Sequence, residues 1–260
     1  MFQYAFAIAA ARMLDTWFLY DTRDLSRYFA VPRAPIPNAA MKRLVRASGR
    51  LLARREVVAD ERDEPEEVMA SLTDRTAYGG HFYSEVFFRA AANEVRSRFQ
   101  VRNEIRNRFM NRYAMLVKTG YVAAHVRLGD YFEYRDDVTL RPGYYRRAFE
   151  VLDSDLPIVV VSDEPERVRA AFANDPGVRV EANDEITDFL LLSHASHLIS
   201  SNSSFAWWAA WLNENEDLRV IAPRWWLGMH EQREVPVRVM REGWQQLDPR
   251  RRDDGSWSPS

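Results

Sequence analysis

Short apolar runs alternate with segments of helical periodicity through the second half of the chain. Runs with the length and the branched aliphatic content of buried strands occur at 121–126, 158–162, 178–181, 198–201 and 218–222. The apolar spacing between them is helical at 142–152, 164–174, 185–195 and 204–213. Strands that alternate with helices in this way predict an α/β fold with a parallel sheet wound with helices.

The first half of the chain is less regular. Residues 1–20 have helical spacing, and a helix at the first residue suggests that the chain begins late for an α/β protein, which usually opens with a strand. Residues 31–75 are expected to be irregular, with a basic helical candidate at 41–55 that could contact anionic lipid or an acceptor, or simply be a surface helix. A charged helix is expected near 91–113, and the polar residues 249–260 are expected to be a disordered tail.

Composition restricts the class of protein. The chain has 260 residues, 47% of them hydrophobic, and a net charge of −2, which argues against general attraction to nucleic acid. It has no cysteine, so disulfides and thiolate metal sites are excluded. No apolar run approaches the roughly 20 residues needed to span a bilayer, and the apolar start lacks the basic region of a signal peptide. We expect a cytoplasmic protein, with peripheral membrane contact left open.

The first candidate site is the heptapeptide His125-Val126-Arg127-Leu128-Gly129-Asp130-Tyr131, which follows the run at 121–124. It would place charge at the carboxyl end of a strand, where open α/β sheets bind ligands. Gly129 would let the backbone turn sharply, and Arg127 offers a planar set of donors suited to phosphate. The alternative is an ordinary strand exit with a solvated pair of Arg127 and Asp130.

The second candidate site begins at Ser200-Ser201-Asn202-Ser203-Ser204 and continues into an aromatic helix. Ser203 or Ser204 can cap this helix, and the free amides at a helix start attract anions. A diphosphate held between Arg127 and this helix start would be neutralised without a metal. The alternative for the serines is capping alone, and the tryptophans that follow are mostly expected in the core.

Two further segments would lie at the same edge. Asp188 stands near a helix start, where its carboxylate could accept two hydrogen bonds from guanine, or could merely suit the helix dipole. Ser162 ends another predicted strand, but that loop is a weak phosphate motif. His194 and His197 have no third ligand nearby, so we expect no metal site.

Taken together, these segments resemble glycosyltransferase family 11, the α-1,2-fucosyltransferases. The matching residues follow the family's order along nearly the whole chain: Met1-Phe2-Gln3-Tyr4-Ala5-Phe6, Phe82-Tyr83-Ser84-Glu85-Val86-Phe87-Phe88, the heptapeptide at 125–131, Tyr144-Tyr145, Ser162-Asp163, Asp188 to His197, and Asn202 to Leu212. The heptapeptide and the last segment are the most specific of these matches.

The resemblance implies a GT-B-like α/β fold of two Rossmann-like domains with parallel sheets. It places an N-terminal acceptor-side domain at 1–119 and a C-terminal GDP-sugar-binding domain at 120–248. The implied donor is GDP-L-fucose and the implied acceptor a galactose-terminated glycan, with inversion and no required metal. Arg127 would grip the diphosphate, His125 and Asp188 would hold guanine, and further donor contacts would come from Ser162, Asn202, Ser203 and Ser204.

Two departures from the family pattern matter. The family has Gly-Leu-Gly-Asn-Gln and a first strand before Met1-Phe2-Gln3-Tyr4, so the first strand of the N-terminal domain is expected to be missing here. The family often has a second arginine where Leu128 stands. The general base is not identified: Asp130 is the first candidate, with Glu133 and Asp136 as rivals and a bracing role for Asp130 as the alternative. A non-catalytic remnant that binds a nucleotide sugar or glycan, and a fucosyltransferase of different linkage, remain as alternative functions.

Overall fold

The computed structural model describes residues 1–18, 20–31, 53–250 and 255–257 and divides the chain into two compact units. Unit 1 contains Met1–Asn103 and Val235–Arg241, and unit 2 contains Glu104–Glu234 and Glu242–Ser260. The predicted division at 119 and 120 therefore differs from the observed grouping in two places. Helix α6 (Asn103–Thr119) falls almost wholly in unit 2, because its Phe109 and Tyr113 pack there, and a short later segment returns to unit 1.

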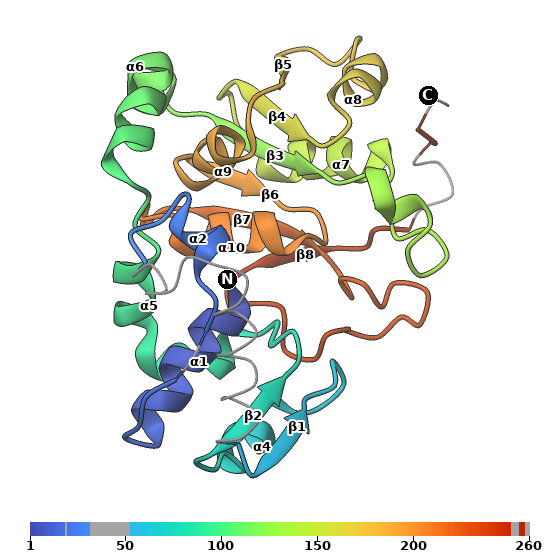
Figure 1. Cartoon of the computed structure of the whole chain (residues 1–260). Helices are drawn as coiled ribbons and strands as arrows, with labels where there is room; N and C mark the ends of the chain where they lie inside the picture. The colour runs from blue at the N-terminus through green and yellow to red at the C-terminus, as the bar shows by residue number, and fades with distance from the viewer. Residues whose placement is uncertain (19, 32–52, 251–254, 258–260) are drawn as a thin grey trace. The chain divides into compact units, whose positions relative to one another are not determined.

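Unit 2 is built on one sheet of six parallel strands in the order β5-β4-β3-β6-β7-β8 (Figure 1). The strands are β3 (Val122–Val126), β4 (Ile158–Ser162), β5 (Val178–Glu181), β6 (His197–Ile199), β7 (Arg219–Pro223) and β8 (Gln245–Leu247). The first five confirm the strands predicted from apolar runs. The sixth was missed because it is short and begins with two exposed glutamines at the sheet edge, so no apolar run marks it.

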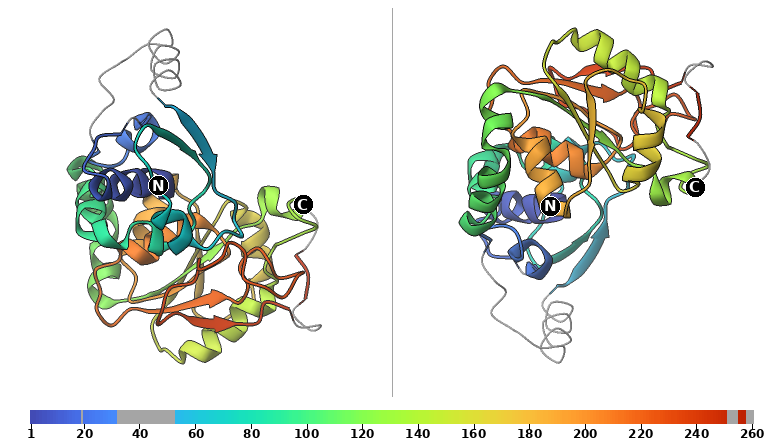
Figure 2. Two further views of the ribbon diagram at one scale, coloured as in Figure 1. Left: turned by 90° about the horizontal axis from the view of Figure 1, so that it is seen from below. Right: turned by 90° about the horizontal axis from the view of Figure 1, so that it is seen from above.

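The helices of unit 2 follow the strands as the parallel fold predicts. They are α6, η3 (Gly129–Phe132), α7 (Pro142–Leu152), α8 (Pro165–Ala171), α9 (Glu185–Ser193) and α10 (Ser204–Leu212). Figure 2 shows α9 and α10 on the face of the sheet opposite α7 and α8. The tryptophans of α10 are almost fully buried, which confirms their expected place in the core.

Strand order places a topological switch point in the middle of the sheet. From β3 the chain proceeds outward to β4 and β5, and then returns to the other side of β3 to form β6, β7 and β8. The carboxyl ends of β3 and β6 are hydrogen-bonded neighbours, with Ala124 paired to Ile199. In open α/β sheets a ligand binds outside the carboxyl ends of the strands at such a point.

Unit 1 consists of helices around a two-stranded parallel sheet. Its elements are α1 (Phe2–Met13), α2 (Arg23–Ser26), β1 (Arg55–Val58), α4 (Pro65–Ala70), β2 (Thr76–Gly79), η1 (Glu85–Phe87), η2 (Arg89–Ala91) and α5 (Ala92–Arg98). Aromatic rings form its core, and Phe6 of α1 stacks on Phe82 with a centroid distance of 3.8 Å. The predicted helix at 1–20 is thus shorter than expected.

The expectation that 31–75 would be irregular is wrong for part of that range. Strand β1 and helix α4 lie within it, because β1 pairs along its whole length with β2, and this pairing is a long-range contact that local composition does not report. Residues 32–52, with most of the basic candidate helix, lie outside the described residues. The structure therefore does not test the lipid or acceptor role suggested for that segment.

The segment 235–241 completes unit 1. The Val237 amide donates to the carbonyl oxygen of Glu61 at 2.9 Å, and Arg238 pairs with Glu66 at 2.8 Å. Arg241 donates two hydrogen bonds to the Glu85 carboxylate, at 2.8 and 3.2 Å.

The prediction of a disordered tail at 249–260 is wrong at Trp257. This ring is 6% exposed, and its indole nitrogen donates to the carbonyl oxygen of Leu140 at 2.9 Å. Burial of a large aromatic ring favours an ordered position even in a polar segment. Residues 251–254 and 258–260 lie outside the described residues.

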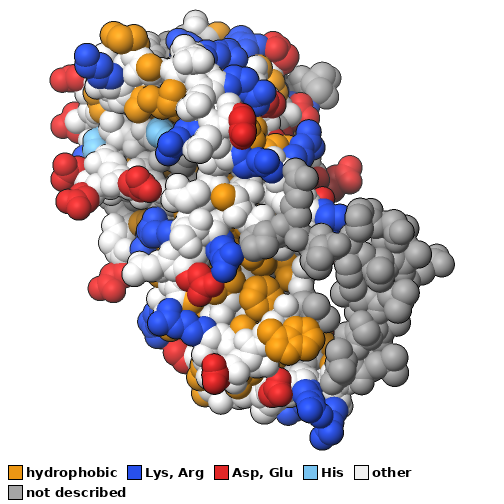
Figure 3. Space-filling model, turned by 60° about the vertical axis from the view of Figure 1, so that its left-hand side comes forward, with side chains coloured by type: hydrophobic (Ala, Val, Ile, Leu, Met, Phe, Trp, Pro, Cys, Tyr) orange, Lys and Arg blue, Asp and Glu red, His pale blue; other side chains and the backbone are white. Residues whose placement is uncertain are grey.

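Unit 1 exposes apolar side chains at the end of α1 and just beyond it. Met13 and Trp17 are more than half exposed and Phe18 is 37% exposed. Figure 3 shows a group of hydrophobic side chains on the face of the molecule that it presents. Within the described part of the chain, none of the helices has both the length and the apolar character required to cross a membrane.

Candidate functional site

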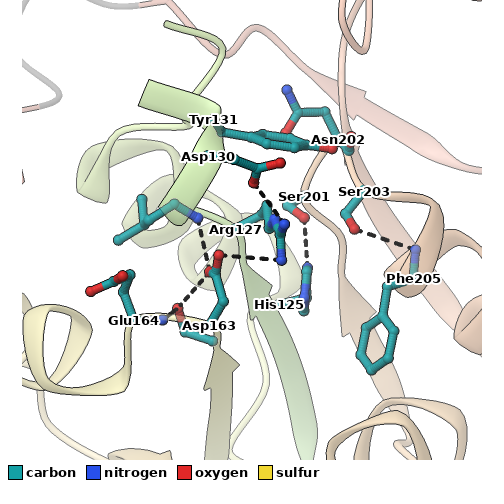
Figure 4. Close-up of polar contacts among 12 residues, drawn as sticks. His125, Arg127, Asp130, Tyr131, Asp163, Glu164, Ser201, Asn202, Ser203 and Phe205 are labelled. Atoms are coloured by element: carbon teal, nitrogen blue, oxygen red, sulfur yellow. Dashed lines mark hydrogen bonds and ion pairs between the residues drawn. The ribbon is translucent and has the colours of Figure 1, made fainter. Parts of the chain in front are cut away.

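The residues predicted to bind a ligand gather at the carboxyl ends of β3, β4 and β6. His125 is the fourth residue of β3 and Arg127 follows its end, while the polar turn 200–203 follows β6. Figure 4 shows the side chains of these loops directed toward one another at the switch point. The structure therefore joins the two segments that the sequence singled out independently.

His125 connects the two central strands. Its Nδ1 lies 2.7 Å from Oγ of Ser201, and the imidazole is 6% exposed. Burial, reinforced by the positive charge of Arg127, lowers the pKa of His125 to about 3. The ring is thus neutral near pH 7, and it can donate or accept one hydrogen bond on each nitrogen without adding charge.

Arg127 is held between two carboxylates. Its Nη2 donates to Oδ1 of Asp130 at 2.6 Å, and its Nη1 lies 3.3 Å from Oδ2 of Asp163 (Figure 4). The guanidinium also lies over the ring of Tyr131, 5.4 Å from the centroid. Its side chain is 35% exposed, so the guanidinium can still meet an anion from solvent.

Asp163 braces the loop that carries Arg127. Its Oδ1 accepts a hydrogen bond from the backbone nitrogen of Leu128 at 2.9 Å, while its Oδ2 faces Arg127. Asp130 is 67% exposed and Asp163 is 24% exposed, so Asp130 is the partner that solvent or a ligand can displace more easily. The sequence interpretation missed the role of Asp163, because only the pairing of β3 with β4 brings the two loops together.

Gly129 is needed for space. A Cβ atom at this position would lie 2.6 Å from Oδ2 of Asp163, well inside van der Waals contact. The backbone of Gly129 does not adopt the left-handed conformation that favours glycine. The expectation of a sharp glycine turn is therefore corrected: glycine allows Asp163 to approach.

The polar turn after β6 leads directly into α10 and supplies its N-cap. The structure assigns capping to Ser203, whose Oγ accepts from the Phe205 nitrogen at 3.3 Å, and leaves Ser204 exposed as the first residue of the helix. The Nδ2 of Asn202 donates to the carbonyl oxygen of Val138 at 2.8 Å. Its buried Oδ1 has no hydrogen-bond partner among the described residues.

Asn202 also receives the loop after β3. The hydroxyl of Tyr131 donates to the carbonyl oxygen of Asn202 at 3.1 Å, so η3 is anchored to the start of α10 (Figure 4). Ser162 has a local role in the structure: its Oγ accepts from the nitrogen of Glu164 at 3.0 Å and shapes the turn after β4. The rival base candidates Glu133 and Asp136 lie exposed in the loop that follows η3.

Asp188 is a buried carboxylate on α9. It is the fourth residue of that helix and is 9% exposed, while Asp184 caps the helix by accepting from the nitrogen of Thr187 at 2.9 Å. Desolvation raises the pKa of Asp188 to about 6, although a hydrogen bond from Nδ2 of Asn183 at 2.9 Å opposes the shift. A buried carboxylate of this kind strongly favours a ligand that brings hydrogen-bond donors.

Aromatic contacts connect Asp188 to the switch point. Phe189, its neighbour on α9, packs edge-on against Phe205 of α10 at 5.4 Å, and Phe205 lies 5.4 Å from the ring of His125. The base-reading candidate and the anion-binding candidates thus belong to one packed region of unit 2. Among the residues that the structure describes, no group of three or more histidine, aspartate or glutamate side chains could hold a metal ion.

Comparisons with known proteins identify the family of the chain. Residues 58–247 match the family described as glycosyl transferase family 11. The O-antigen biosynthesis glycosyltransferase WbnK of Escherichia coli is 34% identical over 113 residues, which cover 39% of this chain and 37% of that protein. An alpha-1,2-colitosyltransferase of Escherichia coli is 32% identical over 126 residues, covering 44% and 43% respectively. Each match thus spans less than half of the relative's length.

A solved structure supports the fold. An Arabidopsis thaliana FUT1 mutant in complex with GDP superposes with a TM-score of 0.54 at 12% identity, covering 85% of this chain and 67% of that chain. At this identity the likeness concerns the fold alone, and it agrees with the GT-B-like α/β architecture of parallel sheets predicted from the sequence. The family match covers most of the chain and includes the whole region around the switch point, so the protein belongs to glycosyl transferase family 11.

Proposed function

We propose that the protein transfers L-fucose from GDP-L-fucose to the 2-hydroxyl of a galactose-terminated glycan, with inversion and without a metal. Family membership supports glycosyl transfer, and the resemblance of the sequence to α-1,2-fucosyltransferases supports the sugar and the linkage. GDP in the FUT1 structure of similar fold supports a guanine nucleotide as the donor.

The observation that carries the proposal is the position of Arg127 beside the start of α10 at the switch point. In the proposed reaction the acceptor oxygen attacks the anomeric carbon, and the bond from this carbon to the β-phosphate oxygen breaks with its electron pair on that oxygen. Negative charge therefore grows on the departing GDP. Arg127 and the free amides of α10 are fixed positive groups that stabilise such charge.

Donor binding would change the partners of Arg127. The positive charge of Arg127 is paired with two carboxylates, so one of them must move away before the guanidinium can bind a diphosphate directly. The exposed Asp130 is the partner that the diphosphate would displace, while Asp163 keeps the loop in place. A displaced Asp130 would be free to accept the proton of the acceptor hydroxyl, which makes it our first candidate for the general base, ahead of Glu133 and Asp136.

In this proposal the base of the donor lies toward α9. The ionised carboxylate of Asp188 accepts hydrogen bonds from N1 and N2 of guanine, and the neutral His125 adds one hydrogen bond without charge. The alternative is that these residues have structural roles only: Asp188 interacts with the dipole of α9, and the serines cap α10. That alternative predicts no preference among nucleoside diphosphates.

A donor and acceptor panel tests the function. Purified protein is assayed with GDP-fucose and GDP-colitose against several galactosides, and with UDP-galactose as a mismatched donor. We expect turnover of GDP-fucose with a terminal galactoside, and a 1→2 linkage of inverted configuration by NMR. Preference for GDP-colitose would instead assign the protein the transferred sugar that is named for its 32% identical relative, the alpha-1,2-colitosyltransferase. GDP binding without any turnover would favour the non-catalytic alternative.

Arg127→Ala gives the sharpest test within the site. We expect the variant to fold, as measured by thermal unfolding, and to lose transfer by roughly 100- to 1000-fold, the usual cost of removing one group that stabilises transition-state charge. Arg127→Lys should recover only part of the loss, because a lysine lacks the planar pair of donors. Near-wild-type turnover in Arg127→Ala would overturn the proposal.

A further inference from the structure

Asp188 uses only part of its hydrogen-bonding capacity within the protein. Its Oδ1 accepts from Nδ2 of Asn183 at 2.9 Å, and among the described residues no hydrogen bond reaches its Oδ2. Asp188 is 9% exposed, and its Oδ2 is not among the completely buried polar atoms that lack a partner. Within the protein, Oδ1 of Asp188 is therefore bonded by Asn183, while Oδ2 keeps its capacity to accept a hydrogen bond.

Asn183 is itself fixed by a tyrosine of another helix. The hydroxyl of Tyr113 on α6 has one proton, which it shares between two acceptors, Oε2 of Glu181 at 2.8 Å and Oδ1 of Asn183 at 3.0 Å. An ionised Asp188 only accepts hydrogen bonds, so the amide nitrogen of Asn183 must face it and the amide oxygen must face Tyr113. The two contacts together leave the amide one orientation.

The tyrosine is well placed for this task. Tyr113 is 3% exposed, and burial with the nearby Glu181 carboxylate raises its pKa to about 12, so the hydroxyl keeps its proton at neutral pH. Glu181 is in turn paired with Arg112, at 3.5 Å, and with Arg179. The chain of contacts from Tyr113 through Asn183 to Asp188 therefore joins α6, the loop after β5 and α9.

We infer that Asn183, oriented by Tyr113, is a positioning residue that sets the direction of the Asp188 carboxylate and so determines selectivity for the 2-amino group of guanine. The inference rests on the proposed use of Asp188 to read the base. Guanine offers two adjacent donors, N1 and the 2-amino group, and only a carboxylate of fixed direction meets both. Hypoxanthine lacks the 2-amino group, and adenine has an acceptor in place of the N1 donor.

The test compares nucleotide selectivity by calorimetry. Dissociation constants are measured for GDP, IDP and ADP with the wild type, Asn183→Ala, Tyr113→Phe and Asn215→Ala. Asn215, on the loop beyond α10, is the control: its side-chain amide likewise donates a hydrogen bond, in this case to the backbone oxygen of Ser196. Thermal unfolding of each variant reports whether it folds.

We expect the wild type to bind GDP at least tenfold more tightly than IDP. Asn183→Ala should bring this ratio close to one by weakening GDP more than IDP, and Tyr113→Phe should lower it by about threefold. Asn215→Ala should keep the wild-type ratio. A general structural role would weaken GDP and IDP equally, which would overturn the inference. If Asn183→Ala does not fold, an unchanged ratio in Tyr113→Phe would also overturn it.

The outcomes separate this inference from the proposed function. No preference of the wild type for GDP over ADP would contradict the proposed donor site itself. A preference for GDP over ADP without one over IDP would leave a purine site but remove the role of Asn183 in reading the 2-amino group.

Discussion

Asp163 shows how one side chain can organise a binding loop. Its carboxylate accepts from the backbone of Leu128 and faces the guanidinium of Arg127, so it connects the end of β4 to the end of β3. Gly129 makes this approach possible by having no side chain. The position of Arg127 therefore depends on two neighbours, Asp163 and Gly129, that are given no contact with the proposed ligand.

Gly129→Ala should separate loop geometry from global stability. The added methyl group would displace Asp163, so we expect about tenfold weaker GDP binding, equivalent to ~1.4 kcal/mol. The control is Gly177→Ala, where φ is +75° and no atom lies within 4 Å of the added Cβ. That variant should lose roughly 1 kcal/mol of unfolding free energy through backbone strain and bind GDP normally. Normal GDP binding by Gly129→Ala would refute the bracing role of Asp163.

The raised pKa of Asp188 predicts opposite pH effects on binding and stability. Burial is the main cause of the shift to about 6; the charges of Asp184 and Glu181 add to it, while Asn183 and Arg112 oppose it. Because the folded pKa exceeds the ordinary 3.8, the folded state binds the proton more tightly, and this group's contribution to stability falls as pH rises from about 4 to 6. Guanine binding needs the ionised form, so affinity should fall below about pH 6.

GDP-fucose is the probe for this titration, because it has no terminal phosphate that titrates near pH 6. Calorimetry from pH 5 to 8 should show the loss of affinity in the wild type and no such step in Asp188→Asn. A step of the same size in both proteins would assign the titration to another group.

At the start of α10, two adjacent serines have different roles: Ser203 caps the helix, and Ser204 is exposed beside its free amides. Ser203 satisfies one amide at the start of the helix, and Ser204 stands exposed in the first turn beside the remaining free amides. The strand order places this helix start next to the loop after β3. Capping and anion binding can therefore be distinguished by comparing the two serines.

Ser203→Ala should cost about 1 kcal/mol of unfolding free energy, the usual value of an N-cap. Ser204→Ala should change stability by less than about 0.5 kcal/mol, as exposed substitutions do, and weaken GDP-fucose binding by about threefold. Ser84→Ala removes the cap of η1 in unit 1 and is the control: it should lower stability without changing affinity. Unchanged binding in Ser204→Ala would favour capping alone.

Across the whole molecule, unit 1 is completed by a segment far along the chain. Residues 235–241 contribute backbone and side-chain bonds to it, including the two hydrogen bonds from Arg241 to Glu85. The side chains of Arg241 and Glu85 are 27% and 28% exposed, so water screens part of the attraction between their charges. Because Arg241 and Glu85 form two parallel hydrogen bonds, we expect their contribution to the free energy of unfolding to lie at the upper end of the range for surface ion pairs.

A double-mutant cycle on Glu85→Gln and Arg241→Gln should give a coupling free energy of about 1 kcal/mol by chemical denaturation. The same cycle on Glu94 and Arg98, a more exposed pair one helical turn apart, should give at most about 0.5 kcal/mol. GDP binding should not change in either cycle, because both pairs belong to unit 1. A coupling near zero for Glu85 and Arg241 would show that the other contacts of residues 235–241, among them the pair of Arg238 with Glu66, hold this segment in unit 1.

Much of unit 2 could be predicted, and the rest could not for identifiable reasons. The inner strands β3, β4, β6 and β7 are largely apolar because both faces of a parallel sheet are covered, so local pattern reports them. Strand β8 and the short sheet of unit 1 contain no buried residue and depend on pairing between segments separated in the chain, which leaves little local signal. Likewise Arg127, Asp188 and Ser203 could be given roles from the sequence, whereas the contacts that give Asp163 and Asn183 their roles exist only in the folded structure.

The sequence by itself determined the alternation of strands and helices, the residues with chemistry at the strand ends, and the resemblance to the family, because each is written in consecutive residues. Tertiary structure alone decided that β3 and β6 are neighbours, which of two serines caps α10, why Gly129 must lack a side chain, and where residues 235–241 and Trp257 belong. Those features depend on distances between residues far apart in the chain, and these are set only when the sheet and the core form.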